Sequence, residues 1–257
     1  MEIKFLVETA LIAHGLHSAT DDDLIFHLSS LNATFCYLEE GQIKLGTIED
    51  FIPLRRKADK LIRIDLNSLE NAISHKLSGA LTASATMAVC KKLNVPLAVT
   101  CGMGGIRNNT SSSDLGALAN TDVTLIATSP KDMIDIPGTL HWLKSNNVSV
   151  FSTKTEFCTG FIFSSTRESV TKLTYENPKS VKGKALILNP IDETKRIADK
   201  TILIKAVSTG IEAEKNGGYF HPAVNKEIDR LTNGYSTKLQ LSSLADNIKL
   251  ALNHAKT

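Results

Sequence analysis

Two ionisable side chains stand where apolar segments end, and both residue types can take part in covalent or proton-transfer chemistry. Lys131 follows the apolar run DVTLIATSP and precedes a segment with helical spacing. A lysine in water is almost wholly protonated at neutral pH, but partial burial and the positive end of a helix both disfavour the ammonium form. An uncharged lysine amine can attack a sugar aldehyde carbon and form an imine. The alternative is a solvated lysine that buries only its aliphatic stem.

Glu8 interrupts the otherwise apolar segment FLVETALIA, so a carboxylate is carried into a buried strand or to its end. Buried carboxyl groups are paired with another group, or their pKa rises towards a value useful for proton transfer. Glu8 is therefore a candidate general acid. His14 stands at the end of the same segment, before Gly15, where it either belongs to the site or only caps a turn.

A third candidate is the segment TCGMGGIRNNTSSSDLGALAN, in which an apolar run ends at Thr100 and a helix is predicted to begin near Ser112 or Ser113. Glycine allows close approach of the backbone, and free amides at a helix start attract phosphate. Ligands of open α/β sheets gather beyond the carboxyl ends of the strands. The segment predicts a phosphate or sugar-phosphate site. Asp114 either belongs to it or only stabilises the first helical turn.

The elements that must position these residues are apolar strand-like runs that alternate with helical patterns. This alternation predicts an α/β fold in three α/β/α layers, with a mostly parallel central sheet flanked by helices. The turn EEGQ between two runs predicts one antiparallel hairpin, and HPAVNKEIDRLTNG and SSLADNIKLALNHAKT predict a helical C-terminal extension. No composition shift marks a boundary, so we expect residues 1–257 to form a single α/β domain. Other helices are predicted near residues 21–30, 78–93, 112–120 and 136–145.

The amino-acid composition indicates which classes of binding partner are not expected. The chain has 257 residues, with 29 Lys and Arg against 27 Asp and Glu, which gives no reason to expect binding to nucleic acid or to an anionic membrane. No apolar run approaches the roughly 20 residues that a membrane helix needs. The four cysteines lie far apart in the sequence, which favours free thiols and a cytoplasmic protein.

Taken together and in order, several segments resemble the pseudouridine-5'-phosphate glycosidase family, also called the indigoidine synthase A family. The matching pieces span nearly the whole chain: VETALIAHG, NATFCYLEEGQIKLG, SGALTASATM, CGMGGI, SSSDLGALANTDVTLIATSPKDMIDIPGTLHWL, LNPI and HPAVNKEIDRLTNGYSTKLQLSSLADNIKLALNHA.

The resemblance implies cleavage of the carbon–carbon bond between ribose 5-phosphate and uracil, with Lys131 as covalent nucleophile and Glu8 as general acid. It implies that Thr82 and Ala83 contact the pyrimidine edge and that Asn247 hydrogen-bonds the base. It also implies a homotrimer and a divalent metal, Mn(II), beside Asp114. The substrate-binding residues are expected to be Arg63, Thr82, Ala83, Ser112, Ser113, Asp114, Asn247, His14 and Arg107, with a small-molecule sugar phosphate as the partner.

The chain departs from the family pattern at two places. The loop RNNTS keeps Arg107 but lacks the aspartate that binds the metal in the family, and Arg63 stands where the family has a lysine. Arginine can hold a phosphate but does not become a neutral amine. Two alternatives therefore stay open: an enzyme that joins ribose 5-phosphate to another acceptor in natural-product biosynthesis, and a non-catalytic sugar-phosphate-binding relative.

Overall fold

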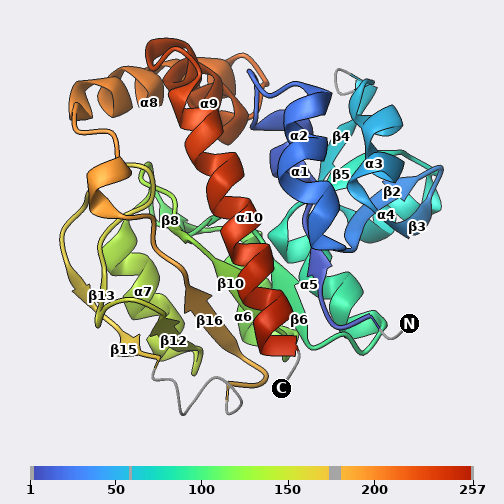
Figure 1. The fold of residues 1–257 in the computed structure, drawn as a ribbon, viewed down its shortest axis with the longest axis horizontal. Helices are drawn as coiled ribbons and strands as arrows, with labels where there is room; N and C mark the ends of the chain where they lie inside the picture. Colours follow the sequence, from blue (N-terminus) through green and yellow to red (C-terminus); the bar gives the residue numbers. More distant parts are fainter. Residues whose placement is uncertain (1–2, 58–59, 174–180, 256–257) are drawn as a thin grey trace.

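The computed structural model of the protein describes residues 3–57, 60–173 and 181–255, and a ten-stranded sheet forms its middle layer (Figure 1). The strands of this sheet are β1 (Leu6–Val7), β2 (Phe35–Glu39), β3 (Gln42–Gly46), β4 (Ile62–Ile64), β5 (Gly79–Leu81), β6 (Leu97–Val99), β10 (Thr124–Ala127), β12 (Ser149–Ser152), β15 (Thr171–Lys172) and β16 (Ala185–Leu188). Their order is β15-β12-β16-β10-β6-β1-β2-β5-β4, and β3 pairs with β2. Most neighbours run parallel, as predicted, while β2 is antiparallel to β3 and β5.

The predicted hairpin at EEGQ is confirmed, since Glu39 of β2 pairs with Gln42 of β3. Three further pairs of short strands add to it. β7 (Gly102–Met103) pairs in parallel with β11 (Ser129–Pro130), and two antiparallel pairs join β8 (Ile106–Arg107) to β9 (Thr110–Ser111) and β13 (Phe157–Cys158) to β14 (Glu168–Ser169). The prediction of a single hairpin therefore undercounts the antiparallel pairs, because two-residue strands leave no alternation in the sequence.

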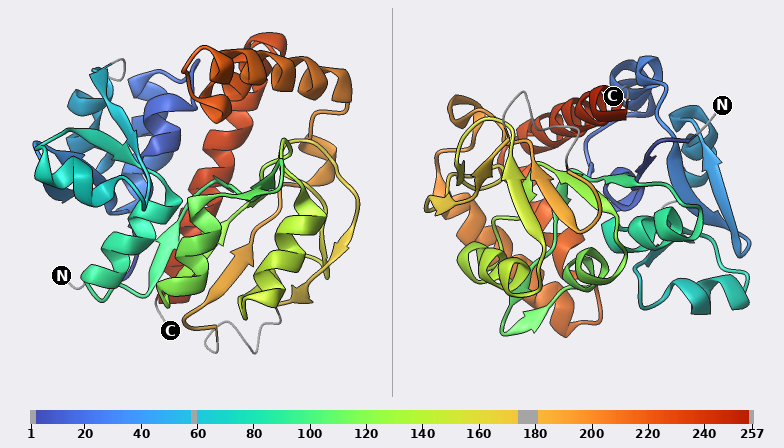
Figure 2. Two further views of the ribbon diagram at one scale, coloured as in Figure 1. Left: turned by 180° about the vertical axis from the view of Figure 1, so that it is seen from behind. Right: turned by 90° about the horizontal axis from the view of Figure 1, so that it is seen from below.

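Helices cover both faces of the sheet, which confirms the three predicted layers (Figure 2). One face carries α1 (Ala10–His14), α2 (Asp21–Leu28), α3 (Ile48–Arg55) and α10 (Tyr235–Ala255), and the other carries α4 (Leu69–Ser74), α5 (Ala83–Lys92), α6 (Ser113–Asn120) and α7 (Ile136–Ser145). Side chains alternate between the two cores along each central strand: in β10, Ile126 packs on the α10 side and Leu125 on the α6 side.

The predicted helical C-terminal extension is confirmed by α8 (Lys200–Lys215), α9 (Phe220–Leu231) and α10. Helix α10 crosses the sheet, while α8 packs mainly on α9 at the top of the molecule (Figure 1). Among the residues that the structure describes, no helix is both long enough and apolar enough to cross a membrane. All four cysteines are free and buried, as the spacing predicts.

Two predicted elements differ from the structure. The segment FLVETALIA forms a two-residue strand and then turns into α1, and the helix predicted near residues 78–93 begins with β5 before α5. Thr9 fixes the first turn, because its hydroxyl donates to Cys36 O and accepts from the Leu81 amide. A short apolar run does not distinguish a strand from a buried helix by periodicity alone.

Candidate active site

The carboxyl ends of three neighbouring strands meet at one edge of the sheet. Strand β1 lies between β2 and β6, and β6 pairs with β10, all in parallel, with Val7 opposite Val99 and Val99 opposite Ile126. This register places Glu8, which follows β1, next to Thr100, which follows β6. Open α/β sheets bind their ligands beyond the carboxyl ends of their strands, as at this site.

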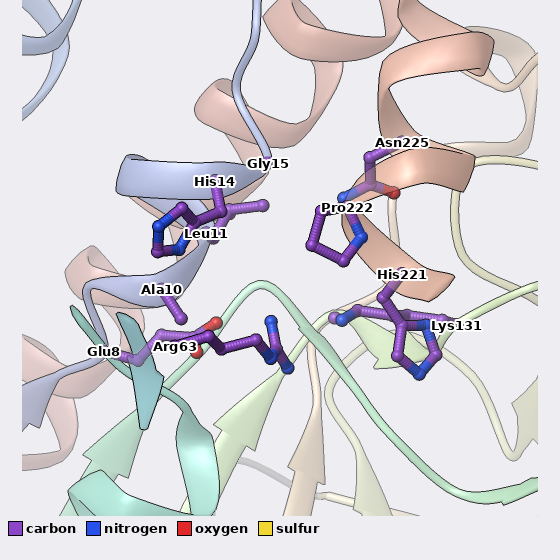
Figure 3. Close-up of a pocket in the computed structure, with 11 residues that line it drawn as sticks. Glu8, Ala10, Leu11, His14, Gly15, Arg63, Lys131, His221, Pro222 and Asn225 are labelled. Carbon is purple, nitrogen blue, oxygen red and sulfur yellow. The ribbon is translucent and has the colours of Figure 1, made fainter. Parts of the chain in front are cut away.

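A pocket opens at this edge, and it brings together several predicted residues from distant parts of the chain (Figure 3). In Figure 3 the side chains of Glu8 and Lys131 point towards each other across the pocket, and the guanidinium of Arg63 lies between them in this view. The lining residues are Glu8, Ala10, Leu11, His14, Gly15, Arg63, Gly102, Lys131, His221, Pro222 and Asn225.

Glu8 is buried, with 6% of its surface exposed, and its carboxyl oxygen Oε1 accepts a hydrogen bond from Thr100 Oγ1 at 2.5 Å. Burial raises the pKa of Glu8 above its usual value, because the charged form loses its hydration. The nearby Lys131 and the Thr100 hydrogen bond oppose that rise without cancelling it. The carboxyl group therefore holds its proton at a higher pH than a glutamate in water, as a general acid requires.

Lys131 is half-buried, and its backbone amide donates to Met103 O at 3.0 Å. Burial lowers the pKa of its amine, and the positive charge of Arg63 lowers it further. The expectation that Lys131 stands at a helix start is wrong, because α7 begins at Ile136 with Asp135 as its N-cap. Desolvation and Arg63, rather than a helix dipole, favour the uncharged amine.

The aliphatic stem of Lys131 lies against Gly102. A larger residue at this position would displace the neighbouring side chains. A Cβ atom at Gly102 would lie 2.8 Å from the Phe161 ring and 3.1 Å from Lys131 Cγ. Phe161 is held in turn by Asp132, whose carboxylate accepts backbone hydrogen bonds from Phe161, Ile162 and Phe163 at 2.8, 2.9 and 3.1 Å. Asp132 thus fixes the segment that packs beside the amine.

Replacing Asp132 with alanine is expected to destabilise the fold by at least about 3 kcal/mol, because three backbone amides lose their acceptor and each unpaired buried donor costs roughly 1–3 kcal/mol. Burial also raises the pKa of Asp132 to about 6. The wild-type protein therefore gains stability from this group below its unfolded-state pKa and loses that contribution as the pH rises through 6. Urea denaturation of both proteins at pH 5 and pH 8 checks this, and equal midpoints for the two would contradict it.

Arg63 and His14 enter the pocket from neighbouring elements, as predicted. Arg63 belongs to β4, the edge strand of the sheet, and is half-buried. His14 ends α1, and its Nε2 lies 3.2 Å from Leu61 O, just before β4. Because Arg63 lowers the pKa of Lys131 and lines the same pocket, it can attract an anionic group of a ligand there.

A second polar cluster joins the starts of α5 and α6 and contains five of the predicted residues. Asp114 accepts backbone hydrogen bonds from Ser84 at Oδ1 and from Gly104 at Oδ2, at 3.0 and 2.8 Å. The hydroxyl of Ser84 links Thr82 Oγ1 to Ser113 Oγ, at 3.0 and 3.1 Å. Ala83, Ser112 and the residues just named come together here, but none of them is among the lining residues of the pocket.

The residues around Asp114 do not fit a resident divalent metal. Both of its carboxylate oxygens already accept amide hydrogen bonds, and Mn(II) prefers several oxygen ligands. Among the described residues, no group of three or more His, Cys, Asp or Glu side chains comes together. Asp114 instead acts electrostatically, since it raises the pKa of both Glu8 and Lys131.

The glycine-rich turn serves packing within this cluster. The amide of Gly104 is used by Asp114, and a Cβ at Gly104 would lie 2.7 Å from Ser112 Oγ. A Cβ at Gly105 would clash with the Thr139 side chain. The Ser112 hydroxyl is buried and has no hydrogen-bond partner among the described residues. The amide of Gly104 is therefore not free for phosphate, whereas the Ser112 hydroxyl could still meet a ligand.

Asn247 is not among the lining residues of the pocket, and its hydrogen bonds tie strand ends together. Its Nδ2 donates to Thr100 O at 2.8 Å and to Thr128 Oγ1 at 3.0 Å, and its Oδ1 accepts from Asn189 at 3.1 Å. One turn earlier on α10, the hydroxyl of Ser243 bonds to Thr128. Since Asn247 is fully buried and already has three partners, it positions the residue that hydrogen-bonds Glu8.

Arg107 lies outside the pocket lining and anchors the α8–α9 pair. It forms an ion pair with Glu214 of α8, and its guanidinium lies 3.9 Å from the ring centroid of Phe220, the first residue of α9. These two contacts hold the first turn of α9 over the strand ends, where Pro222 lines the pocket.

Replacing Arg107 with alanine is expected to cost about 1 kcal/mol of stability, since a largely exposed ion pair and a cation–π contact each contribute roughly 0.5–1 kcal/mol. We expect the loss to be local, with faster amide hydrogen exchange in α8 and α9 and unchanged protection in β6 and β10. Uniform loss of protection throughout the sheet would contradict the anchoring role.

Among the lining residues that were not predicted, His221, Pro222 and Asn225 all lie on the first turns of α9. The signal that could have found them is a polar stripe at every fourth position, His221, Asn225 and Asp229, on a helix whose other buried residues are apolar. Both Asn225 and Asp229 are buried, at 4% and 5% exposure. A buried polar stripe of this kind is unusual unless it faces a site.

Known proteins resemble this chain over nearly its whole length. A pseudouridine-5'-phosphate glycosidase of Caldanaerobacter subterraneus is 27% identical over 95% of this chain and 88% of its own, and one of Staphylococcus aureus is 26% identical over 97% and 87%. Among solved structures, an indigoidine synthase A-like protein of Thermotoga maritima matches with a TM-score of 0.85 at 20% identity, covering 99% of this chain and 94% of its own.

A second solved structure, the prealnumycin C-glycosynthase AlnA in complex with ribulose 5-phosphate, matches with a TM-score of 0.78 at 20% identity, covering 98% of this chain and 90% of its own. These two likenesses confirm the fold. The model of one family, described as indigoidine synthase A like protein, matches residues 7–257, the segment that carries every residue of the pocket. The chain therefore belongs to the indigoidine synthase A like protein family.

Proposed function

We propose that the protein is a C-glycosidase that cleaves the carbon–carbon bond between ribose 5-phosphate and a uracil-type base, with pseudouridine 5'-phosphate as the simplest substrate. The observation that carries this proposal is the pairing, in one pocket, of a carboxyl group with a raised pKa and an amine with a lowered pKa, Glu8 and Lys131. The relatives named pseudouridine-5'-phosphate glycosidase support the choice of substrate.

The chemistry explains why these two residue types occur together. The uncharged amine of Lys131 bonds to C1' of the ribose while the C1'–O4' bond breaks, and O4' keeps the electron pair and takes up a proton. The atom that must leave C1' is a ring carbon of the base, so it needs a proton before it departs. Glu8, held in its protonated form, supplies that proton.

The nitrogen lone pair then completes the cleavage. It forms a C1'=N double bond as the bond from C1' to the base breaks, and the electrons of the broken bond return to the ring of the base. Water adds to the imine carbon, and the C1'–N bond breaks as the new hydroxyl becomes the aldehyde. The hydroxyl proton passes to the Glu8 carboxylate, so Lys131 recovers its amine and Glu8 its proton as ribose 5-phosphate is released. Arg63 is positioned to attract an anionic group of the substrate within the same pocket.

The direct test is incubation of the purified protein with pseudouridine 5'-phosphate, followed by chromatography of the nucleotide, free uracil and ribose 5-phosphate. We expect equal amounts of the two products. Uridine 5'-phosphate, in which nitrogen rather than carbon joins the base to the sugar, is the matched control substrate. Absence of uracil from pseudouridine 5'-phosphate at any protein concentration would reject the proposal.

The pH profile of kcat/KM should be bell-shaped. It should also be narrower than the profile expected from a glutamate and a lysine with their usual pKa values. Activity needs Lys131 uncharged and Glu8 protonated at the same time, so it falls at low pH, where the amine is protonated, and at high pH, where the carboxyl group is ionised. The two shifts bring these values towards each other, and the apparent values belong to the pair. A flat profile between pH 5 and pH 9 would contradict this account.

The second candidate function is formation, rather than cleavage, of this type of carbon–carbon bond. Such an enzyme would join ribose 5-phosphate to another acceptor in natural-product biosynthesis. The feature that favours it is Arg63 in the pocket, at the position where the family pattern has a lysine. An enzyme that forms a C-glycoside needs the same imine, because C1' must accept electrons from an acceptor carbon. Incubation with ribose 5-phosphate and electron-rich aromatic acceptors, read by mass spectrometry, separates the two directions.

A non-catalytic sugar-phosphate-binding relative is the remaining alternative. Borohydride reduction in the presence of ribose 5-phosphate, followed by intact mass, distinguishes it from both enzymes. An enzyme that uses Lys131 gains one reduced sugar phosphate, whereas a binding protein keeps its mass.

We also infer a homotrimer in a reducing, cytoplasmic setting. Two apolar residues of α8, Ile204 and Ile211, are 67% and 41% exposed, and a subunit interface would cover such a surface. The four free buried cysteines suit a reducing compartment. Sedimentation equilibrium tests the assembly, and a monomer at micromolar concentration would reject it.

A further inference from the structure

The side chain of His221 enters the pocket from the first turn of α9 and lies beside Lys131 (Figure 3). Its ring nitrogen Nδ1 is buried and has no hydrogen-bond partner among the residues that the structure describes. A buried nitrogen left without a partner costs roughly 1–3 kcal/mol. A bound molecule in the pocket would supply that partner, which makes His221 a candidate to contact substrate.

The surroundings of His221 keep its ring uncharged. Burial lowers its pKa well below the usual value near 6.5, and the positive charges of Lys131, Arg63 and Arg107 lower it further. The acids nearby are otherwise engaged: Glu214 pairs with Arg107, Glu8 bonds to Thr100, and Asp114 accepts two amides. An uncharged imidazole can accept a proton at one ring nitrogen and later release it.

The proposed reaction needs a proton carrier besides Glu8. When Lys131 bonds to C1', its nitrogen must lose a proton, and O4' of the opened ribose must gain one. Glu8 cannot serve this step, because its proton is consumed at the base. Arginine is not among the side chains that usually transfer protons in catalysis, and both oxygens of Asp114 are occupied by amides. Of the residues that line the pocket, His14 and His221 carry imidazoles, and Figure 3 shows His221 beside Lys131 and His14 on the far side.

We propose that His221 is a further catalytic residue, which relays protons between the amine of Lys131 and the oxygen atoms of the substrate. This inference rests on the proposed function. In the first half of the reaction, His221 Nδ1 accepts one proton from the nitrogen bonded to C1' and delivers it to O4'. In the second half it accepts a proton from the water that adds to the imine and returns it to the departing amine. The other proton of that water passes from the C1' hydroxyl to the Glu8 carboxylate as the C1'=O bond forms. His221 and Glu8 thus both return to their starting states, so no other reactant is required.

The test compares three substitutions. His221→Asn places an amide near the position of Nδ1, which keeps hydrogen bonding but cannot carry a proton, and His221→Ala leaves space for added imidazole. His75→Phe is the matched control, because His75 is exposed at the end of α4 and away from the pocket. Circular dichroism and thermal midpoints establish that each variant is folded.

We expect kcat for pseudouridine 5'-phosphate to fall by about 10²–10⁴-fold in both His221 variants, the usual contribution of general acid–base catalysis, with little change in KM. Imidazole should restore part of the rate to His221→Ala in proportion to the concentration of its uncharged form, and His75→Phe should match the wild type. A purely structural histidine would not respond to imidazole.

Two results would overturn the inference alone: wild-type kcat in His221→Asn, or a large loss that appears only in KM. Either would leave the proposed function intact, because wild-type protein would still cleave the nucleotide and Lys131→Ala would not. If wild-type protein neither cleaves the nucleotide nor forms a borohydride-reducible adduct, the proposed function fails and the relay is rejected with it.

Discussion

Replacing Lys131 with alanine is expected to abolish cleavage of pseudouridine 5'-phosphate, with a loss in kcat on the order of 10⁴-fold or more, as is usual when a covalent nucleophile is removed. The physical reason is that no other lining residue of the pocket carries an amine that can bond to C1', since Arg63 carries a guanidinium and an imidazole nitrogen gives no stable imine. The measurement is paired with borohydride trapping: wild-type protein incubated with ribose 5-phosphate should gain one reduced sugar phosphate, and the variant should gain none.

Lys131→Met is the control for folding, because methionine keeps the stem that packs on Gly102 and removes only the amine. Its thermal midpoint should equal or exceed that of the wild type, since a half-buried amine with a lowered pKa contributes little favourable charge energy. Turnover by either variant at the wild-type rate would eliminate the covalent mechanism. Turnover lost only in the alanine variant would indicate a role in packing.

Glu8→Gln should give the next largest effect, a fall in kcat of about 10²–10⁴-fold from loss of the general acid. Glutamine has nearly the same shape, and its carbonyl oxygen can still accept from Thr100 Oγ1, so the fold should be unaffected. The variant should nevertheless form the borohydride-reducible adduct with ribose 5-phosphate, because that step does not protonate a base. Loss of both cleavage and trapping would assign Glu8 a different role.

Thr100→Val is the matched control for Glu8. It removes the hydroxyl that donates to the carboxyl group, and since this hydrogen bond lowers the pKa of Glu8, its loss should raise that pKa further. At strongly alkaline pH, where the protonated fraction of Glu8 limits the rate, kcat/KM should therefore rise, while the maximal rate changes far less than in Glu8→Gln. A fall in kcat/KM at that pH would contradict the assignment of Glu8 as the acid.

That Glu8 and Lys131 belong to one pocket could be anticipated from the sequence, because Glu8 interrupts an apolar run and Lys131 directly follows one. Burial of an ionisable group costs free energy unless the group is paired or hydrogen-bonded, so both residues stand out without knowledge of the fold. The parallel sheet follows from apolar runs that alternate with helical patterns, and its strand ends bring these residues together. The helix start predicted at Lys131 was wrong because the turn before α7 takes five residues.

The residues that the sequence did not reveal depend on contacts between distant segments. His221 and Asn225 reach the pocket only because α9 is folded back over the strand ends, and helical spacing alone does not say which face of α9 is covered. Arg107 is close in sequence to the pocket residue Gly102, but its partners Glu214 and Phe220 come from α8 and α9. A side chain whose role depends on packing against a segment far away in the sequence produces no pattern in its own stretch of sequence.

Helix α10 sets the order in which this site can assemble during synthesis. Thr100, which holds the carboxyl group of Glu8, has its own carbonyl bound by Asn247, and Thr128 is bound by Ser243 and Asn247. A nascent chain still lacking residues 235–255 would leave those strand ends open to water and one face of β6 uncovered. The hydroxyl that holds the Glu8 carboxyl group would thus gain its fixed position only once the ribosome has delivered α10.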